Sequence, residues 1–155
     1  MKKCLIAILM AAILTSMFAV PAFAAEEDII VPDENTVIQL PNGLTLESEL
    51  IIHDSASRAS TKTAEKIYRL KANGTTVATA SLIATFRYTG SSVSVEDTNY
   101  SYTTTSGYSY SHSGITKSGG TATMKGTFKQ TVSGILVGST PFTIKMTCTA
   151  NGQIS

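Results

Sequence analysis

Residues 76–88, TVATASLIATFRY, determine the fold class because apolar side chains recur at every second position. The apolar set comprises Ala78, Ala80, Leu82, Ala84, Phe86 and Tyr88. A period of two predicts a β-strand with one face in a core and one face in water. Residues 121–132 follow the same pattern, with Ala122, Met124, Gly126, Phe128 and Val132 as the inward set. Residues 142–150 also follow it, with Phe142, Ile144, Met146 and Cys148.

Turn signals separate these strands at short intervals. Asn73-Gly74 is typical of a two-residue hairpin turn, in which both residues need a positive φ. Asn42-Gly43, between residues 36–40 and 44–52, predicts a further hairpin. No helical period of useful length follows residue 24. We therefore expect an all-β, antiparallel β-sandwich of about seven to nine strands, preceded by a signal-peptide helix. It is immunoglobulin-like in architecture only, because the chain has no Trp and no second cysteine for a mature disulfide.

The N-terminus has the organisation of an export signal. Lys2 and Lys3 precede an apolar run over residues 5–20, and Ala22-Phe23-Ala24 provides a small-x-small cleavage site. We predict a signal peptide at 1–24 that is cleaved after Ala24, a secreted protein, and no membrane span in the mature chain. Cleavage leaves Cys148 alone, either as a small buried hydrophobe or as a reactive thiol.

Charge is segregated along the mature sequence. Residues 25–54 contain eight acids and no base, whereas residues 55–155 contain ten bases and three acids. This predicts an acidic N-terminal segment and linker at 25–60 and a β-sandwich domain at 61–155. Three interpretations of the acidic segment remain open. It is a first pair of strands that packs on a basic sheet, or a pro-segment that is cut near Arg58 or Lys62. Alternatively it is a flexible spacer, and the basic domain that follows rests on an anionic cell envelope.

Residues 99–112, NYSYTTTSGYSYSH, are nearly mirror-symmetric about Thr105 and predict a hairpin. Its cross-strand pairs would be Tyr102 with Tyr108, Tyr100 with Tyr110, and Thr98 with His112. The parity of the tyrosines is opposite to that of the neighbouring apolar residues Val93, Val95 and Ile115. A β-bulge near Glu96-Asp97 and Gly114 would reverse the faces and make the tyrosines part of the core. Without a bulge they would form a platform for sugar rings or a protein partner.

The sequence offers no constellation typical of catalysis. His53 and His112 are the only histidines, and no metal-binding, phosphate-binding or nucleophile motif has the required spacing. Glu96, Asp97, Asn99 and Ser101 provide fewer oxygens than a hard cation prefers. We therefore expect no cofactor and no metal. A net charge of +1 argues against nucleic acid as a partner.

The opening residues 1–25 resemble secretory signals of Gram-positive bacteria, and the remainder resembles small exported β-proteins of that group with no assigned function. Residues 99–116 are loosely similar in composition to bacteriocins of the lactococcin 972 type. The resemblance implies export from a Gram-positive cell and carries over no functional residue.

Together these observations predict a secreted, non-enzymatic protein that binds at or near the bacterial cell surface. Its partner would be a cell-wall polymer, a carbohydrate or another surface protein. The expected contact residues are Tyr100, Tyr102, Tyr108, Tyr110, His112, Lys125 and Lys129. The alternatives are an antibacterial or toxin-like protein with an acidic pro-segment, and an extracellular hydrolase without a recognisable motif.

Overall fold

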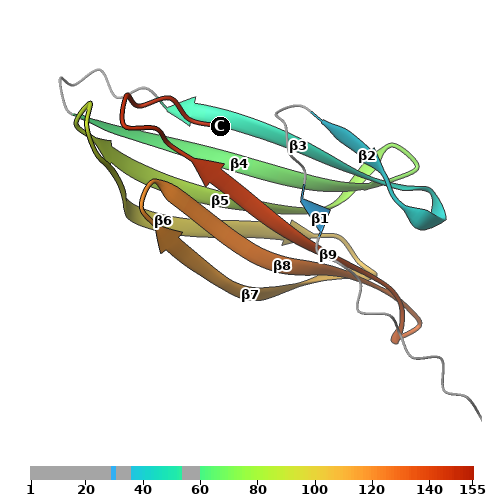
Figure 1. The fold of residues 1–155 in the computed structure, drawn as a ribbon. Coiled ribbons are helices and arrows are strands. Elements are labelled where there is room, and N and C mark those ends of the chain that lie inside the picture. The colour runs from blue at the N-terminus through green and yellow to red at the C-terminus, as the bar shows by residue number, and fades with distance from the viewer. Residues whose placement is uncertain (1–28, 31–35, 54–59) are drawn as a thin grey trace, which may run out of the picture.

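The computed structural model describes residues 29–30, 36–53 and 60–155, which form a sandwich of nine strands in two sheets (Figure 1). The predicted all-β sandwich is confirmed. The predicted signal-peptide helix, the cleavage site after Ala24 and the proposed processing site at Arg58 lie outside the described residues.

The first sheet is an antiparallel meander of five strands in the order β2-β3-β4-β5-β6. Its strands are β2 (Val37–Gln39), β3 (Leu44–His53), β4 (Thr61–Ala72), β5 (Thr75–Tyr88) and β6 (Val93–Thr104). Both predicted Asn-Gly hairpins are present. Asn73 and Gly74 join β4 to β5 with φ values of 50° and 79°, which the tight turn requires. A short 3₁₀ turn, Pro41–Gly43, joins β2 to β3.

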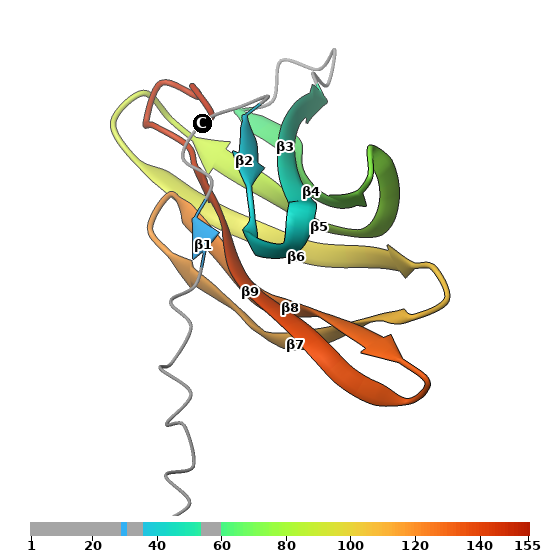
Figure 2. The same ribbon diagram turned by 90° about the vertical axis from the view of Figure 1, so that its right-hand side faces the viewer.

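The second sheet has the order β1-β9-β8-β7. Its strands are β7 (Tyr108–Ser118), β8 (Thr121–Val132) and β9 (Ile135–Thr147), again an antiparallel meander, and β1 (Ile29–Ile30), which runs parallel to β9. Figure 2 shows the two sheets stacked, with β6 above β7 along one margin. The chain crosses between the two meanders once, between β6 and β7.

The core lies between the sheets and consists of the alternating residues that the sequence indicates. The largest fully buried side chains are Tyr68, Phe86, Phe128, Phe142, Leu46, Leu70, Leu82, Met124, Ile144, Met146 and Cys148. Cys148 is therefore a buried, unpaired thiol, as one of the two interpretations predicts. The expectation that Val132 points inward is wrong. Its side chain is exposed because it is the last residue of β8, next to the turn into β9.

Side chains from β4 reach across the sandwich to carbonyl oxygens of β9 and of the C-terminal turn. The Tyr68 hydroxyl donates to the Thr143 carbonyl at 3.1 Å, and the ammonium groups of Lys66 and Lys62 donate to Lys145 O at 3.3 Å and Gly152 O at 3.0 Å. Buried backbone carbonyls and charged groups are costly without a partner. These hydrogen bonds therefore connect β4 of one sheet to β9 and the C-terminal turn on the other side of the sandwich.

The acidic stretch contributes β2 and β3 to the five-stranded sheet. Every residue of β3 pairs with β4, and Leu46 is completely buried in the core. On the solvated face, Glu47 bonds to Lys71 at 2.6 Å and Glu49 to Arg69 at 2.5 Å. The described strands of the acidic stretch, β2 and β3, are thus paired with the β-sandwich predicted at 61–155. This arrangement agrees with the interpretation of the stretch as a first pair of strands.

Charge differs between the two sheets. The strands of the five-stranded sheet carry five basic and five acidic residues, and three ion pairs connect members of the two groups. The strands of the four-stranded sheet carry four lysines and no acid: Lys117, Lys125, Lys129 and Lys145. The net positive charge of the described strands therefore lies in β7, β8 and β9, because the charges of the five-stranded sheet sum to zero.

Candidate functional site

The predicted tyrosine hairpin does not form, because β6 and β7 belong to different sheets. Thr105 and Gly107 turn the chain out of one sheet and into the other. The Thr105 amide donates to Val77 O in β5, and Gly107 O accepts from the Thr131 amide in β8. Each strand pairs with its own sheet, so the segment forms a corner of the sandwich.

The predicted bulges are present on both sides of this corner. Glu96 is the extra residue of β6, since Val95 pairs with Phe86 and Asp97 with Thr85. Ser113 is the extra residue of β7, since His112 pairs with Gly126 and Gly114 with Lys125. An extra residue reverses the parity of a strand. Consequently the tyrosines occupy the same inner faces as Val95 and Ile115, although they lie at the margin of the sandwich.

Aromatic side chains of β6 and β7 meet along this margin and form what we call the aromatic seam: Tyr100, Tyr102, Tyr110 and His112. Tyr100 stacks on His112 with a centroid distance of 4.1 Å and an interplanar angle of 4°. Tyr102 lies 4.8 Å from Tyr110. These contacts are displaced by two residues from the predicted pairs, because the seam joins two sheets and follows no hairpin register.

Tyr110 anchors the seam to the core. Its ring lies 6.0 Å from Phe128 and 6.2 Å from Phe142, and Gly126 provides the space that it occupies. The hydroxyl makes a 3.1 Å hydrogen bond with His112 Nδ1. Burial raises the pKa of Tyr110 from 10.0 to about 12, and the neighbouring phenols of Tyr100 and Tyr102 add to the shift. This hydroxyl therefore stays protonated throughout the physiological range.

The seam presents little free aromatic surface. Tyr102 has 53% of its surface exposed, whereas the ring of Tyr100 is covered on one side by His112. Tyr108 is half-buried and packs against the core at the start of β7. The expectation that the tyrosines are core residues is thus met only in part: Tyr108 and Tyr110 are partly buried and pack against the core, whereas Tyr100 and Tyr102 are exposed. The physical reason is that β6 and β7 are the outermost strands of their sheets, so their inward side chains are covered from one side only.

Lys125 and Lys129 lie on the opposite side of β8 from the seam. Met124, Gly126 and Phe128 alternate with them and are buried, so both lysines project from the outer face. Lys145 of β9 is on the same face, since it pairs with Thr123 while Lys125 pairs with Thr143. We call Lys125, Lys129 and Lys145, with the Ser and Thr residues between them, the lysine face. The predicted contact residues therefore divide between two surfaces.

Lys145 is missing from the sequence-based set, although its odd position in the alternating residues 142–150 places it on the polar side. The exposed apolar residues Ile135, Leu136 and Val137 are also missing from that set. Their signal is three consecutive apolar residues directly after the Ser133-Gly134 turn.

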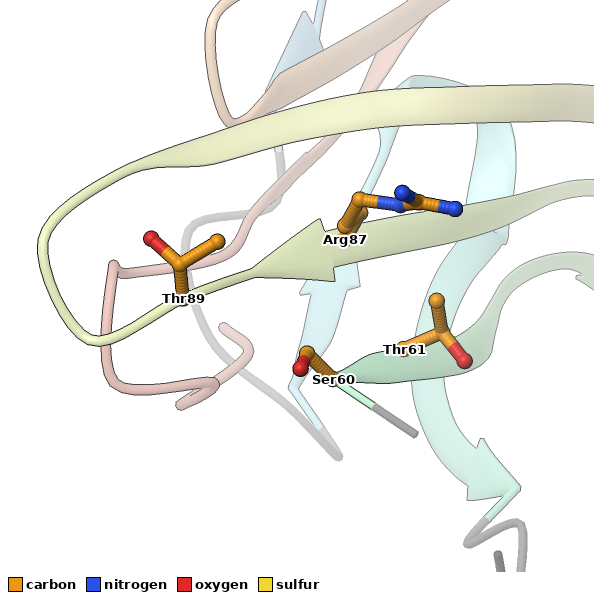
Figure 3. A pocket seen from close by; sticks show the side chains of 4 residues that line it. All are labelled: Ser60, Thr61, Arg87 and Thr89. Carbon is orange, nitrogen blue, oxygen red and sulfur yellow. The ribbon is translucent and has the colours of Figure 1, made fainter. Parts of the chain in front are cut away.

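A pocket of about 280 Å³ opens where β4 begins and β5 ends. Among the described residues it is lined by Ser60, Thr61, Arg87 and Thr89, whose side chains are drawn in Figure 3. The Arg87 guanidinium pairs with Glu96, so its charge is already compensated. Neither histidine is among these lining residues, and the described residues hold no group of three or more His, Cys, Asp or Glu that fits a metal ion.

No family model matches the chain, and no curated protein or solved structure is significantly similar to it. Within the described part of the chain, no helix has the length and apolar character needed to cross a membrane.

Proposed function

We propose that this chain is a secreted, non-enzymatic β-sandwich protein of a Gram-positive bacterium that binds an anionic polymer of the cell envelope through the lysine face. The observation that carries the proposal is the charge of the four-stranded sheet, whose strands have four lysines and no acid. Three of these lysines share one outer face with many hydroxyl groups.

The chemistry of this face fits phosphate or carboxylate groups repeated along a polymer. Lysine provides a compact positive charge, and Ser and Thr hydroxyls donate hydrogen bonds to anionic oxygens. The strands are about 4.8 Å apart, so Lys125 and Lys145, on adjacent strands, lie close enough to contact successive anionic groups. Solvent and salt screen such contacts beyond roughly 8–10 Å, so we expect binding that weakens with ionic strength.

The test is sedimentation with purified cell walls at low and high salt. We expect wild-type protein to be retained at low salt and released at high salt. The combined variant Lys125→Gln, Lys129→Gln and Lys145→Gln should lose retention at low salt. Lys117→Gln is the matched control, because Lys117 belongs to the same sheet but pairs with Ala122 on the inner face. Equal retention of the triple variant and wild type would refute the proposal.

Carbohydrate stacking is supported less well, because only Tyr102 in the seam has more than half of its surface exposed. The interpretation as a toxin with a pro-segment also has less support. Cleavage near Arg58 would remove β2 and β3, expose the core around Leu46, and break the ion pairs of Glu47 and Glu49. Mass spectrometry of the secreted product distinguishes a start at Ala25, which we expect, from a start near Ala59.

A further inference from the structure

The tip of the β8–β9 hairpin is apolar and exposed. We call Val132, Ile135, Leu136 and Val137 the hairpin tip; their exposed fractions are 56%, 69%, 56% and 52%. Ser133 and Gly134 form the turn between them, with φ values of 51° and 80°. Figure 2 shows this hairpin projecting at the end of the four-stranded sheet. Exposed apolar side chains that are contiguous, and not scattered, mark an interaction site.

The hairpin tip is apolar on both of its faces. Val132 pairs with Ile135 and Thr131 with Leu136, which leaves Val137 as the extra residue of β9. Strict alternation would place successive side chains on opposite faces of the hairpin. Here three consecutive apolar residues cover both faces, so the tip is not one edge of an apolar surface that continues from the core. It is suited to being surrounded by apolar material.

The positive charge near the hairpin tip indicates which apolar environment would bind it. Lys129 lies three residues before Val132, about 10 Å along the strand, and the sheet that carries the tip has no acid in its strands. An apolar insertion with lysine behind it is complementary to a bilayer whose headgroups are anionic. We propose that the hairpin tip inserts into the interfacial region of an anionic lipid bilayer and thereby holds the protein at a membrane surface.

The backbone of the hairpin is compatible with this insertion. Polar backbone groups are costly in hydrocarbon unless they are bonded within the protein. Val132 pairs with Ile135 and Thr131 with Leu136, so the cross-strand ladder continues to the turn, while Ser133, Gly134 and the extra residue Val137 lie outside it. Ile135, Leu136 and Val137 thus provide apolar side chains for a shallow insertion into the interfacial region, where headgroups and water can bond the backbone groups that the ladder leaves free. This inference adds a lipid contact to the polymer contact proposed above, and the two can fail separately.

The first experiment uses tryptophan as a local probe, since the chain has none. Ile135→Trp reports on the tip, and Ile52→Trp is the matched control: Ile52 is exposed, apolar, and paired with Ala64 near the opposite end of the sandwich (Figure 1). With vesicles of phosphatidylglycerol and phosphatidylcholine, we expect a blue shift and quenching by brominated lipid only for Trp at 135. Both variants contain the same remaining residues, so a difference between the emission of Trp at 135 and that of Trp at 52 reports on the hairpin tip and not on another apolar segment of the chain. A Trp at 135 that keeps its aqueous emission would overturn the proposal.

The second experiment measures partitioning into the same vesicles. Ile135→Ser with Leu136→Ser should lower the partition coefficient by at least roughly tenfold, because several methylene equivalents are lost. Ile52→Ser should leave it unchanged. Lys129→Gln should lower it by roughly fivefold for anionic vesicles and leave it unchanged for phosphatidylcholine alone.

Two further outcomes distinguish a lipid contact at the tip from a contact with a second copy of the chain or with the cell wall. If wild type forms a dimer in sedimentation and the Ile135→Ser, Leu136→Ser variant is a monomer, a second copy covers the tip and the proposal is wrong. Cell-wall retention of that variant should match wild type, since the lysine face is intact. Loss of both vesicle binding and wall retention in the tip variant would overturn the assignment of two separate contacts.

Discussion

Gly126 provides the space that the Tyr110 ring occupies, and an added methyl group there would collide with that ring. A Cβ at this position would lie 2.6 Å from Tyr110 Cε2, 2.9 Å from its hydroxyl oxygen and 3.0 Å from Phe142 Cζ. Ordinary contacts begin near 3.4 Å, so two rings would have to move. We predict that Gly126→Ala destabilises the protein, because Tyr110 fixes the aromatic seam to the core and cannot stay in place.

The magnitude combines two opposing terms. Overpacking a well-packed core costs about 1–3 kcal/mol. Replacing Gly by Ala within a strand recovers about 0.5–1 kcal/mol of backbone entropy. The difference is a net loss centred on about 1 kcal/mol, which lowers Tm by roughly 3–6 °C for a domain of this size. Gly138→Ala is the control, since its added Cβ would be 3.4 Å from the nearest atom, in the flexible Gln130 side chain.

Thermal unfolding followed by circular dichroism measures both variants. Gly138→Ala should match or slightly exceed wild type. In a Tyr110→Ala background, where two of the three close contacts are absent, Gly126→Ala should cost less than it does alone. If Gly126→Ala is as stable as Gly138→Ala, or costs the same in both backgrounds, Tyr110 is not the anchor of the seam.

Three further predictions follow from burial. Leu46→Ala should lower the free energy of unfolding, measured in urea, by about 2–5 kcal/mol, because Leu46 is completely buried. Val37→Ala is the control at an exposed site of β2 and should change it by less than about 0.5 kcal/mol. Equal effects of the two substitutions would place β3 outside the core. The pKa of Tyr110 is raised from 10.0 to about 12, so the stability that its protonated hydroxyl contributes is complete below pH 10 and is lost as pH rises toward 12. Alkaline unfolding of wild type and of Tyr110→Phe measures this loss. A variant that loses stability with pH as steeply as wild type would contradict the prediction. Cys148 should react with a thiol reagent only after denaturant is added, because its side chain is buried and burial raises its pKa; rapid reaction of the native protein would refute that burial.

The period of two in residues 76–88 and 142–150 was enough to predict strands, inward faces and the burial of Cys148, because each inner residue packs against the opposite sheet. The parity conflict between the tyrosines and Val95 also indicated bulges as one of two alternatives, and the structure has bulges at Glu96 and Ser113. In both cases the information is local, since a side chain's face depends only on its position in its own strand.

Sheet membership was not predictable in the same way. The symmetry of residues 99–112 is equally compatible with a hairpin and with two edge strands of different sheets, and the hydrogen bonds of Thr105 and Gly107 to Val77 and Thr131 decide between them. The exposure of Val132 has a similar cause. Its parity is that of a core residue, but it lies at the exposed tip of the β8–β9 hairpin.

The margins of the sandwich limit how easily another chain could extend either sheet. Unpaired strand edges invite other chains to extend a sheet, which is the first step toward aggregation. The edge strands β1 and β2 are only two and three residues long. The long edge strands β6 and β7 each carry a bulge, which interrupts the row of backbone donors and acceptors that an incoming strand would need. The edges of β6 and β7 therefore provide no long regular template for a strand of another chain.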